Sequence, residues 1–141
     1  MINRIFKNVC VTGAGSGIGK AIAIAMSNQG YNVTCADINL KQANETLEII
    51  LNSNGSGISI ETDVTKINDI EKMINIAVDH FGGLNILFNN AGIGGAVGPI
   101  THIDADEWDK SFQMLLKSVF LGCKYAARVL IKKNVGGSII N

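Results

Sequence analysis

The chain has 141 residues, of which 47% are hydrophobic and 17% are charged, a composition typical of one globular domain and not of a disordered segment. Twelve basic residues balance twelve acidic ones, and this zero net charge argues against a nucleic-acid-binding surface. No apolar run has the length of a membrane span and the first seven residues carry no leader pattern, so we expect a cytoplasmic protein that binds neither nucleic acid nor membrane.

A short β-branched run opens the chain at residues 9–12 and leads into alternating glycines and then an apolar periodic segment. This order predicts a strand, a tight turn and a helix. Glycine accepts positive φ and lets another group approach the backbone closely. The N-terminus of the following helix offers unpaired N–H groups and the positive end of the helix dipole, so we expect this turn to bind a phosphate or pyrophosphate.

Known phosphate-loop patterns can be tested against this turn. The Walker A pattern fails because Ala14 and Ala21 occupy two of its required positions. The Gly-x-Gly-x-x-Gly pattern fails in every register, since its last glycine falls on Ile18, Lys20 or Ile22. The spacing Thr-Gly-x-x-x-Gly-x-Gly does fit, and it resembles the cofactor loop of the short-chain dehydrogenase/reductase family. An ordinary glycine-rich turn between strand and helix is the alternative.

This resemblance implies an NAD(P)-dependent oxidoreductase that acts on alcohols or carbonyls. In the loop we expect the cofactor to be contacted by Gly13, Ser16, Gly17, Ile18 and Gly19. Helix patterns also alternate with short β-rich runs along the whole chain, which is typical of a parallel sheet with helices on both faces. We therefore expect one α/β domain over residues 1–141, a doubly wound, Rossmann-like, three-layer α/β/α fold with strand order 3-2-1-4-5.

The second predicted strand, residues 31–36, ends at Asp37, which lies 18 residues past Gly19. In dinucleotide-binding folds an acidic residue about 20 positions past the glycine turn accepts hydrogen bonds from the adenosine ribose. The alternative is a helix-capping aspartate, although Asn39 with Gln42 makes the better cap.

The residue at position 37 also affects whether NAD or NADP binds. A carboxylate at Asp37 repels a 2′-phosphate, and Ser16 and Ile38, where family members that use NADP often carry a basic residue, are uncharged. These features favour NAD over NADP.

A second helix is predicted over residues 40–54 and a third strand over residues 58–61, followed by Asp63 and Val64. This pair resembles the Asp-Val of the same family, in which the carboxylate lies near the exocyclic amine of adenine and the valine lies against the ring. A strand-end aspartate before a Thr65 cap is the alternative.

A third helix, residues 67–81, and a fourth strand, residues 84–88, precede Asn89-Asn90-Ala91-Gly92. This run resembles the Asn-Asn-Ala-Gly motif of the family, in which one asparagine ties the central strands together. The resemblance implies that Asn90, Ala91 and Gly92 line the cofactor cleft. The glycine-rich loop over residues 93–103 leaves the carboxyl end of a strand, so a binding role and a plain connection both remain open.

Asp104 with Glu107 predicts the cap of a long helix over residues 105–133. Apolar side chains cover more of this helix than one sheet face can bury. We expect self-association through it, and the resemblance implies the same, since family members commonly pair this helix across a two-fold axis. Residues 138–141 then begin a fifth strand, where the sequence stops.

The family's catalytic serine and Tyr-x-x-x-Lys have no counterpart among these residues. Tyr125 is followed four positions later by Val129, and aligning residues 114–117 with the family's Val-Asn-Leu-Lys places Leu115 at the asparagine of the proton relay. Three widely spaced cysteines without a Cys-x-x-Cys pair argue against a metal site. We therefore expect a truncated, NAD-binding part of an oxidoreductase that does not turn over substrate. A noncatalytic NAD-binding module and a non-functional fragment are the alternatives.

Overall fold

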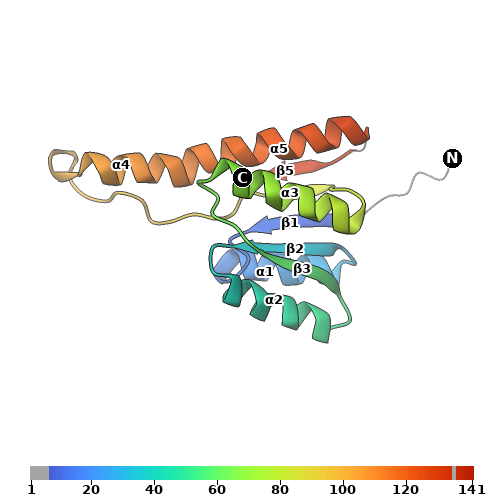
Figure 1. Cartoon of the computed structure of the whole chain (residues 1–141). Helices are drawn as coiled ribbons and strands as arrows, with labels where there is room; N and C mark the ends of the chain where they lie inside the picture. The colour runs from blue at the N-terminus through green and yellow to red at the C-terminus, as the bar shows by residue number, and fades with distance from the viewer. Residues whose placement is uncertain (1–6, 135) are drawn as a thin grey trace.

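The computed structural model describes residues 7–134 and 136–141. These residues form one parallel sheet in the order β3-β2-β1-β4-β5, which confirms the predicted topology (Figure 1). The strands are β1 (Asn8–Thr12), β2 (Asn32–Asp37), β3 (Ser56–Glu61), β4 (Ile86–Phe88) and β5 (Ser138–Ile140). Each connection between neighbouring parallel strands is a crossover through a helix or a long loop, as parallel pairing requires.

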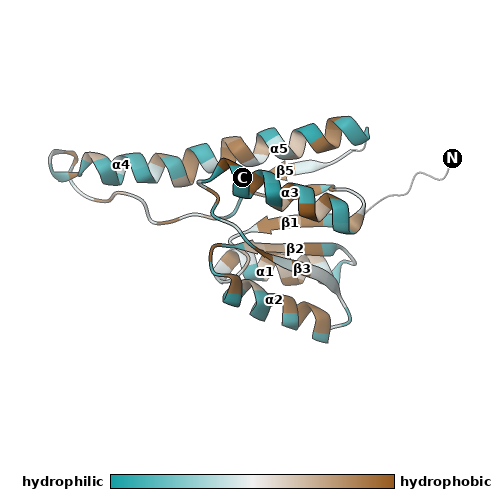
Figure 2. Cartoon of the chain, in the orientation of Figure 1, coloured by the Kyte–Doolittle hydropathy of each residue, from teal (hydrophilic) through white to brown (hydrophobic). Residues whose placement is uncertain are grey.

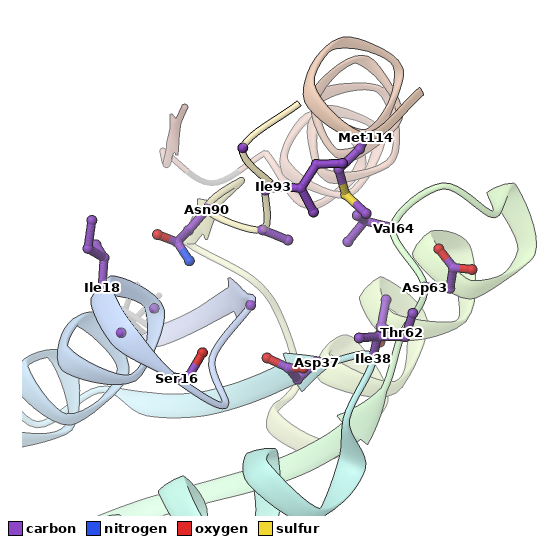
Figure 3. A pocket seen from close by; sticks show the side chains of 16 residues that line it. Ser16, Ile18, Asp37, Ile38, Thr62, Asp63, Val64, Asn90, Ile93 and Met114 are labelled. Atoms are coloured by element: carbon purple, nitrogen blue, oxygen red, sulfur yellow. The ribbon is translucent and has the colours of Figure 1, made fainter. Parts of the chain in front are cut away.

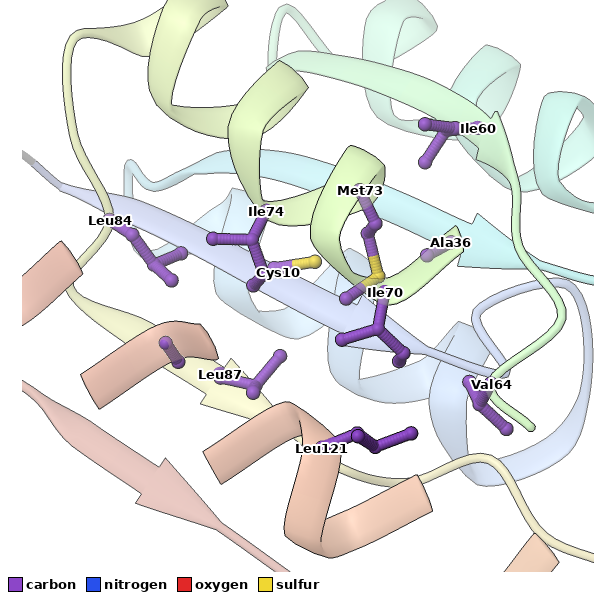
Figure 4. Packing of buried hydrophobic residues seen from close by; sticks show 11 residues of the cluster. Cys10, Ala36, Ile60, Val64, Ile70, Met73, Ile74, Leu84, Leu87 and Leu121 are labelled. Atoms are coloured by element: carbon purple, nitrogen blue, oxygen red, sulfur yellow. The ribbon is translucent and has the colours of Figure 1, made fainter. Parts of the chain in front are cut away.

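Helices cover both faces of this sheet. Figure 1 shows α1 (Gly17–Asn28) and α2 (Leu40–Asn52) on one side of the strands, and α3 (Ile67–Phe81) and α5 (Ser118–Lys133) on the other. Every residue of β1 is buried, because alternate side chains of this central strand enter a hydrophobic cluster on each face. Figure 4 shows Met73 and Ile74 of α3 and Leu121 of α5 packed over Cys10 and Leu87.

Each of these fully buried aliphatic side chains contributes about 1.5–3 kcal/mol. Burial also raises the pKa of the Cys35 thiol to about 12, so this cysteine acts as a small hydrophobe.

Several element boundaries differ from those predicted. Strand β3 begins at Ser56 and not at residue 58, because Ser56 and Gly57 pair with β2 although neither has β propensity. Helix α2 ends at Asn52 and not at residue 54, since Asn54 adopts a left-handed φ of 60° and the Gly55 N–H bonds back to the Ile50 carbonyl. Strand β2 lies one residue later than predicted, and β4 begins two residues later, at Ile86.

The long predicted helix is present but not uniform. It consists of α4 (Ala105–Phe112), a π-helical turn over Gln113–Lys117, and α5. Asp104 caps its start, since its carboxylate accepts the N–H groups of Asp106 and Glu107 at 2.9 and 3.2 Å. A short 3₁₀ helix, Ile100–His102, lies in the connection that leads from β4 to this long helix.

Hydrophobic colouring in Figure 2 marks β1 and recurs along the helix that runs from α4 into α5. Much of that apolar surface is exposed, including the side chains of Trp108, Phe112, Leu116 and Phe120. None of the helices in the described part of the chain combines the length and apolarity that crossing a membrane requires.

Candidate functional site

A cleft of about 560 Å³ opens at the carboxyl ends of the central strands, where ligands bind in open parallel sheets (Figure 3). Every residue that the sequence predicts as a cofactor contact lines it. Five further residues, which the sequence analysis did not assign to the site, complete the lining. The full set is Gly13, Ser16, Gly17, Ile18, Gly19, Asp37, Ile38, Thr62, Asp63, Val64, Asn90, Ala91, Gly92, Ile93, Gly94 and Met114.

The glycine turn between β1 and α1 forms one wall of the cleft. Gly13 and Gly17 adopt left-handed φ values of 67° and 50°, which a residue with a Cβ adopts only under strain. The Ser16 side chain forms no capping hydrogen bond with any described residue, so the first turn of α1 keeps unpaired backbone N–H groups beside the cleft. This wall therefore offers an anion both N–H donors and the positive end of the α1 dipole.

Gly19 fixes how closely the turn and the helix pack. A Cβ built at Gly19 would overlap the carbonyl oxygen of Gly13 and would lie 2.6 Å from Asn90 Nδ2. A residue larger than glycine at position 19 would therefore require the backbone to move.

Asp37 stands at the end of β2 and is 9% exposed. Its Oδ2 accepts the N–H of Gly15 at 2.8 Å, and its Oδ1 accepts the N–H of Asn39 at 2.9 Å. These two bonds fix the carboxylate at the edge of the cleft, and each oxygen keeps acceptor capacity for a ligand hydroxyl. The cap of α2 is Asn39, whose Oδ1 accepts the Gln42 N–H at 3.2 Å, as predicted.

Asp63 makes local contacts instead of projecting freely into the cleft. Its Oδ1 accepts the N–H and the hydroxyl of Thr65, at 3.0 and 2.7 Å, and its Oδ2 lies 3.3 Å from Lys66 Nζ. The Thr65 hydroxyl holds the pKa of Asp63 below its ordinary value, while partial burial opposes this shift. The alternative of a Thr65 cap is wrong, because β3 ends at Glu61 and the N-cap of α3 is Lys66, which makes no side-chain capping bond with any described residue; Thr65 bonds to Asp63 instead. The adenine contact stays a prediction.

The neighbours of Asp63 supply the apolar side of the cleft. Val64 and Met114 lie across the opening from Ser16 and Asp37 in Figure 3. Thr62, only 2% exposed, also borders this region. This side of the cleft is therefore more apolar than the wall formed by the glycine turn and Asp37.

Asn90 and Thr12 join β1 to β4 beneath the cleft. The Thr12 hydroxyl donates to the Phe88 carbonyl at 3.1 Å and accepts the N–H groups of Asn90 and Ala91, both at 3.0 Å. Asn90 Nδ2 donates to the Thr12 carbonyl at 2.9 Å. The predicted asparagine tie between the central strands is present, and the part played by Thr12 was missed because a hydroxyl at a strand end carries no distinctive sequence signal.

Tyr125 lies outside the cleft, in a separate hollow between α3 and α5, where Arg128 stands 5.2 Å from its ring. Leu115 belongs to the π-helical turn and contacts the loop that follows β4. The described residues contain no group of three or more His, Cys, Asp or Glu side chains that could hold a metal ion. The cleft itself offers backbone N–H donors on one wall and apolar side chains on the other.

Comparison with known proteins gives a consistent result. A model of the short chain dehydrogenase family matches residues 7–141. The chain is 34% identical over 139 residues to glucose 1-dehydrogenase 2 of Bacillus subtilis (strain 168), covering 96% of this chain and 53% of that protein. It is 33% identical over 142 residues to cyclohexanol dehydrogenase of Acinetobacter sp. (strain SE19), covering 100% of this chain and 56% of that protein.

Solved structures of similar fold share about the same sequence identity with this chain. A 3-ketoacyl-ACP reductase from Sinorhizobium meliloti 1021 superimposes with a TM-score of 0.89 at 32% identity, covering 94% of this chain and 51% of that one. A 7α-hydroxysteroid dehydrogenase complexed with NADH and 7-oxo glycochenodeoxycholic acid gives a TM-score of 0.88 at 32% identity, with the same coverage. The chain spans about half the length of the curated relatives it matches.

Proposed function

Because this chain belongs to the short-chain dehydrogenase/reductase family, we propose that it is the NAD-binding part of an oxidoreductase that moves a hydride between nicotinamide and an alcohol or carbonyl. The observation that carries the proposal is the single cleft that gathers the glycine turn, Asp37 and the Asn90-Ala91-Gly92 segment. The hydride chemistry is supplied by the nicotinamide when it is bound. The residues of this chain hold and orient the dinucleotide.

Each wall of the cleft suits one part of the dinucleotide. The unpaired N–H groups at the start of α1 suit the pyrophosphate, and the close packing at Gly19 keeps the turn near enough to donate to it. The Asp37 carboxylate suits the two adenosine ribose hydroxyls. Val64 and Met114 suit the faces of the adenine ring.

Asp37 supports NAD over NADP as the cofactor. A 2′-phosphate on the ribose would bring a second negative charge against a carboxylate that is 9% exposed and already fixed by Gly15 and Asn39. The similar 7α-hydroxysteroid dehydrogenase, which was solved with NADH, agrees with a nicotinamide cofactor in this fold. Ser16 and Ile38, on either side, bring no basic group to offset the charge.

The proposal is tested by titrating the purified chain with NADH and NADPH and following cofactor fluorescence or heat. We expect tighter binding of NADH, and we expect Asp37→Ala to weaken NADH binding about tenfold or more and to abolish the preference. Asn39→Ala is the matched control, because it removes the cap of α2 but keeps the ribose-binding carboxylate. Equal affinity for the two cofactors, or an unchanged preference in Asp37→Ala, would contradict the assignment.

A noncatalytic binding module is the second candidate, and Leu115 favours it. Leucine has no donor or acceptor, so it cannot take the place of a side chain that relays protons. A positioned acid or base typically contributes about 10²–10⁴-fold to such a reaction. We expect this chain by itself to bind NADH and to show no substrate-dependent oxidation of NADH with a panel of ketones. Steady turnover that follows the chain through purification would contradict this expectation.

We also propose that copies of the chain associate through the helix over residues 105–133. Phe112, Leu116 and Phe120 border an apolar hollow on its outer face, and Phe120 is 60% exposed. Burying such side chains against a second copy removes apolar surface from water. The substitution Phe120→Glu is expected to shift the molecular mass measured by light scattering toward that of a monomer. A wild-type chain that is monomeric at high concentration would contradict this proposal.

A further inference from the structure

The loop over residues 92–98 forms one wall of the cleft, through Gly92, Ile93 and Gly94. Figure 1 shows it as part of the long connection that runs from β4 alongside α4. Its own side chains do little to hold it in place, since Ile93 is 52% exposed and Val97 is 86% exposed. Loops with few buried contacts sample many conformations, and ordering them costs free energy when a ligand binds.

Two contacts from the long helix hold this loop. The Ser111 hydroxyl accepts the N–H of Ala96 at 2.7 Å and donates to the Glu107 carbonyl at 2.8 Å, so it pins the loop to α4. The second contact is made by Leu115. Its Cδ2 lies 3.3 Å from the position that a Cβ on Gly92 would take, and its Cδ1 lies 3.5 Å from the equivalent position on Gly95. The two methyl groups therefore lie against the two glycines.

The long helix reaches both the loop and the cleft from its π-helical turn. In the turn over Gln113–Lys117, Met114 lines the cleft while the next residue, Leu115, contacts the loop. A single wide turn of this kind is frequent at functional sites.

Gly92 accepts this contact because it lacks a side chain, since a Cβ there would lie tightly, 3.3 Å from Leu115 Cδ2, whereas the 3.5 Å at Gly95 is an ordinary contact. Gly95 has a left-handed φ of 69°, and the absence of a Cβ at both glycines leaves their backbone exposed to the leucine methyls. An asparagine at position 115 would place an amide against these two glycines and would carry no methyl group.

We propose that Leu115 is a positioning residue that latches loop 92–98 against the long helix, in the conformation that shapes the cleft for the dinucleotide. The latch acts by packing. It lowers the ordering cost of binding because the wall is already in place before the ligand arrives. The part of the proposal that concerns the cofactor rests on the proposed function, whereas the latch itself is a property of the ligand-free chain.

The test compares four variants in two measurements. Hydrogen exchange of the backbone amides in residues 93–98 is measured without ligand, and NADH affinity is measured by fluorescence titration. Leu115→Ala and Leu115→Asn remove the methyl contacts, and Leu115→Met keeps an apolar side chain of similar volume. Leu51→Ala is the matched control, because this leucine of α2 is 50% exposed, close to the 46% of Leu115, and lines neither the cleft nor the hollow of the long helix.

We expect the alanine and asparagine variants to speed exchange in the loop and to weaken NADH binding about three- to tenfold. The methionine variant should keep both properties close to those of the wild type, and Leu51→Ala should alter neither. A purely structural role for Leu115 would lower global stability without this local change in exchange. Unchanged loop exchange in Leu115→Ala overturns the latch. If the wild-type chain fails to bind NADH while Leu115→Ala still frees the loop, the latch stands and the proposed cofactor function fails.

Discussion

Gly19 offers a sharp test of how the cleft is assembled, through the substitution Gly19→Ala. A single methyl group at this position would overlap the Gly13 carbonyl oxygen and would lie 2.7 Å from the Gly13 carbonyl carbon, closer than the 3.0 Å that real Cβ atoms respect. Gly13 is backbone in a left-handed turn and cannot rotate aside as a flexible side chain could. The turn, or the start of α1, has to move.

The magnitude follows from the contacts that this movement disturbs. Forcing a methyl group into a packed site costs typically about 1–3 kcal/mol. Moving Asn90, whose Nδ2 donates to the Thr12 carbonyl at 2.9 Å, costs a further ~0.5–1.5 kcal/mol. The higher helix propensity of alanine returns up to about 1 kcal/mol. We therefore expect a net destabilisation of about 1–3 kcal/mol, or about 3–10 °C in melting temperature for a domain of this size.

The assay is thermal and urea denaturation followed by circular dichroism, with NADH titration of the folded variant. NADH binding should weaken, because the displaced turn carries the N–H groups proposed to hold the pyrophosphate. Gly94→Ala is the stability control, since no described atom lies within 4 Å of its Cβ position and its φ is not left-handed. Its stability should stay the same or rise by up to about 1 kcal/mol. Equal melting temperatures for Gly19→Ala and wild type would refute the reasoning.

Two further predictions concern stability. Thr34 is fully buried in β2, and its hydroxyl has no hydrogen-bond partner among the described residues. The near-isosteric Thr34→Val should therefore raise the free energy of unfolding, measured by urea titration, by about 1–2 kcal/mol. An unchanged urea midpoint would count against this prediction. The lowered pKa of Asp63 means that its ionised form stabilises the fold above the unfolded value near 3.8, and that this contribution is lost as pH falls through the folded pKa. Stability measured from pH 5 downward should therefore decline less steeply in Asp63→Asn than in wild type, and parallel curves would contradict this.

The sequence predicted the sheet order and the residues that line the cleft because both depend on signals that are local in the chain. The glycine spacing, the acidic residue that ends β2 and the Asn-Asn-Ala-Gly run each mark the carboxyl end of a strand. A parallel sheet places such ends at one edge, so residues as far apart as Gly13 and Gly92 meet without any sequence record of the contact.

Tertiary features without a local signal were missed. Nothing in residues 113–117 indicates a π-helical turn, because its hydrogen-bond pattern depends on packing and not on helix propensity. The local contacts of the Asp63 carboxylate depend on the rotamers of Thr65 and Lys66. Met114 lines the cleft from this same turn, far in the sequence from the other lining residues, so no local pattern marks it.

The Thr12 hydroxyl uses its full bonding capacity, one donor and two acceptor positions, on the carbonyl of Phe88 at the end of β4 and on the N–H groups of Asn90 and Ala91 just after it. These hydrogen bonds join the end of β1, where the glycine turn begins, to the segment around Asn90. We therefore expect this floor of the cleft, residues 12–13 and 88–91, to move as one rigid unit. Changes in the shape of the cleft are then expected in two segments outside the floor, which are residues 62–64 and the loop over residues 92–98. Among proteins that share this floor, differences in ligand affinity should come from substitutions in those two segments. Substitutions in the floor itself should be poorly tolerated.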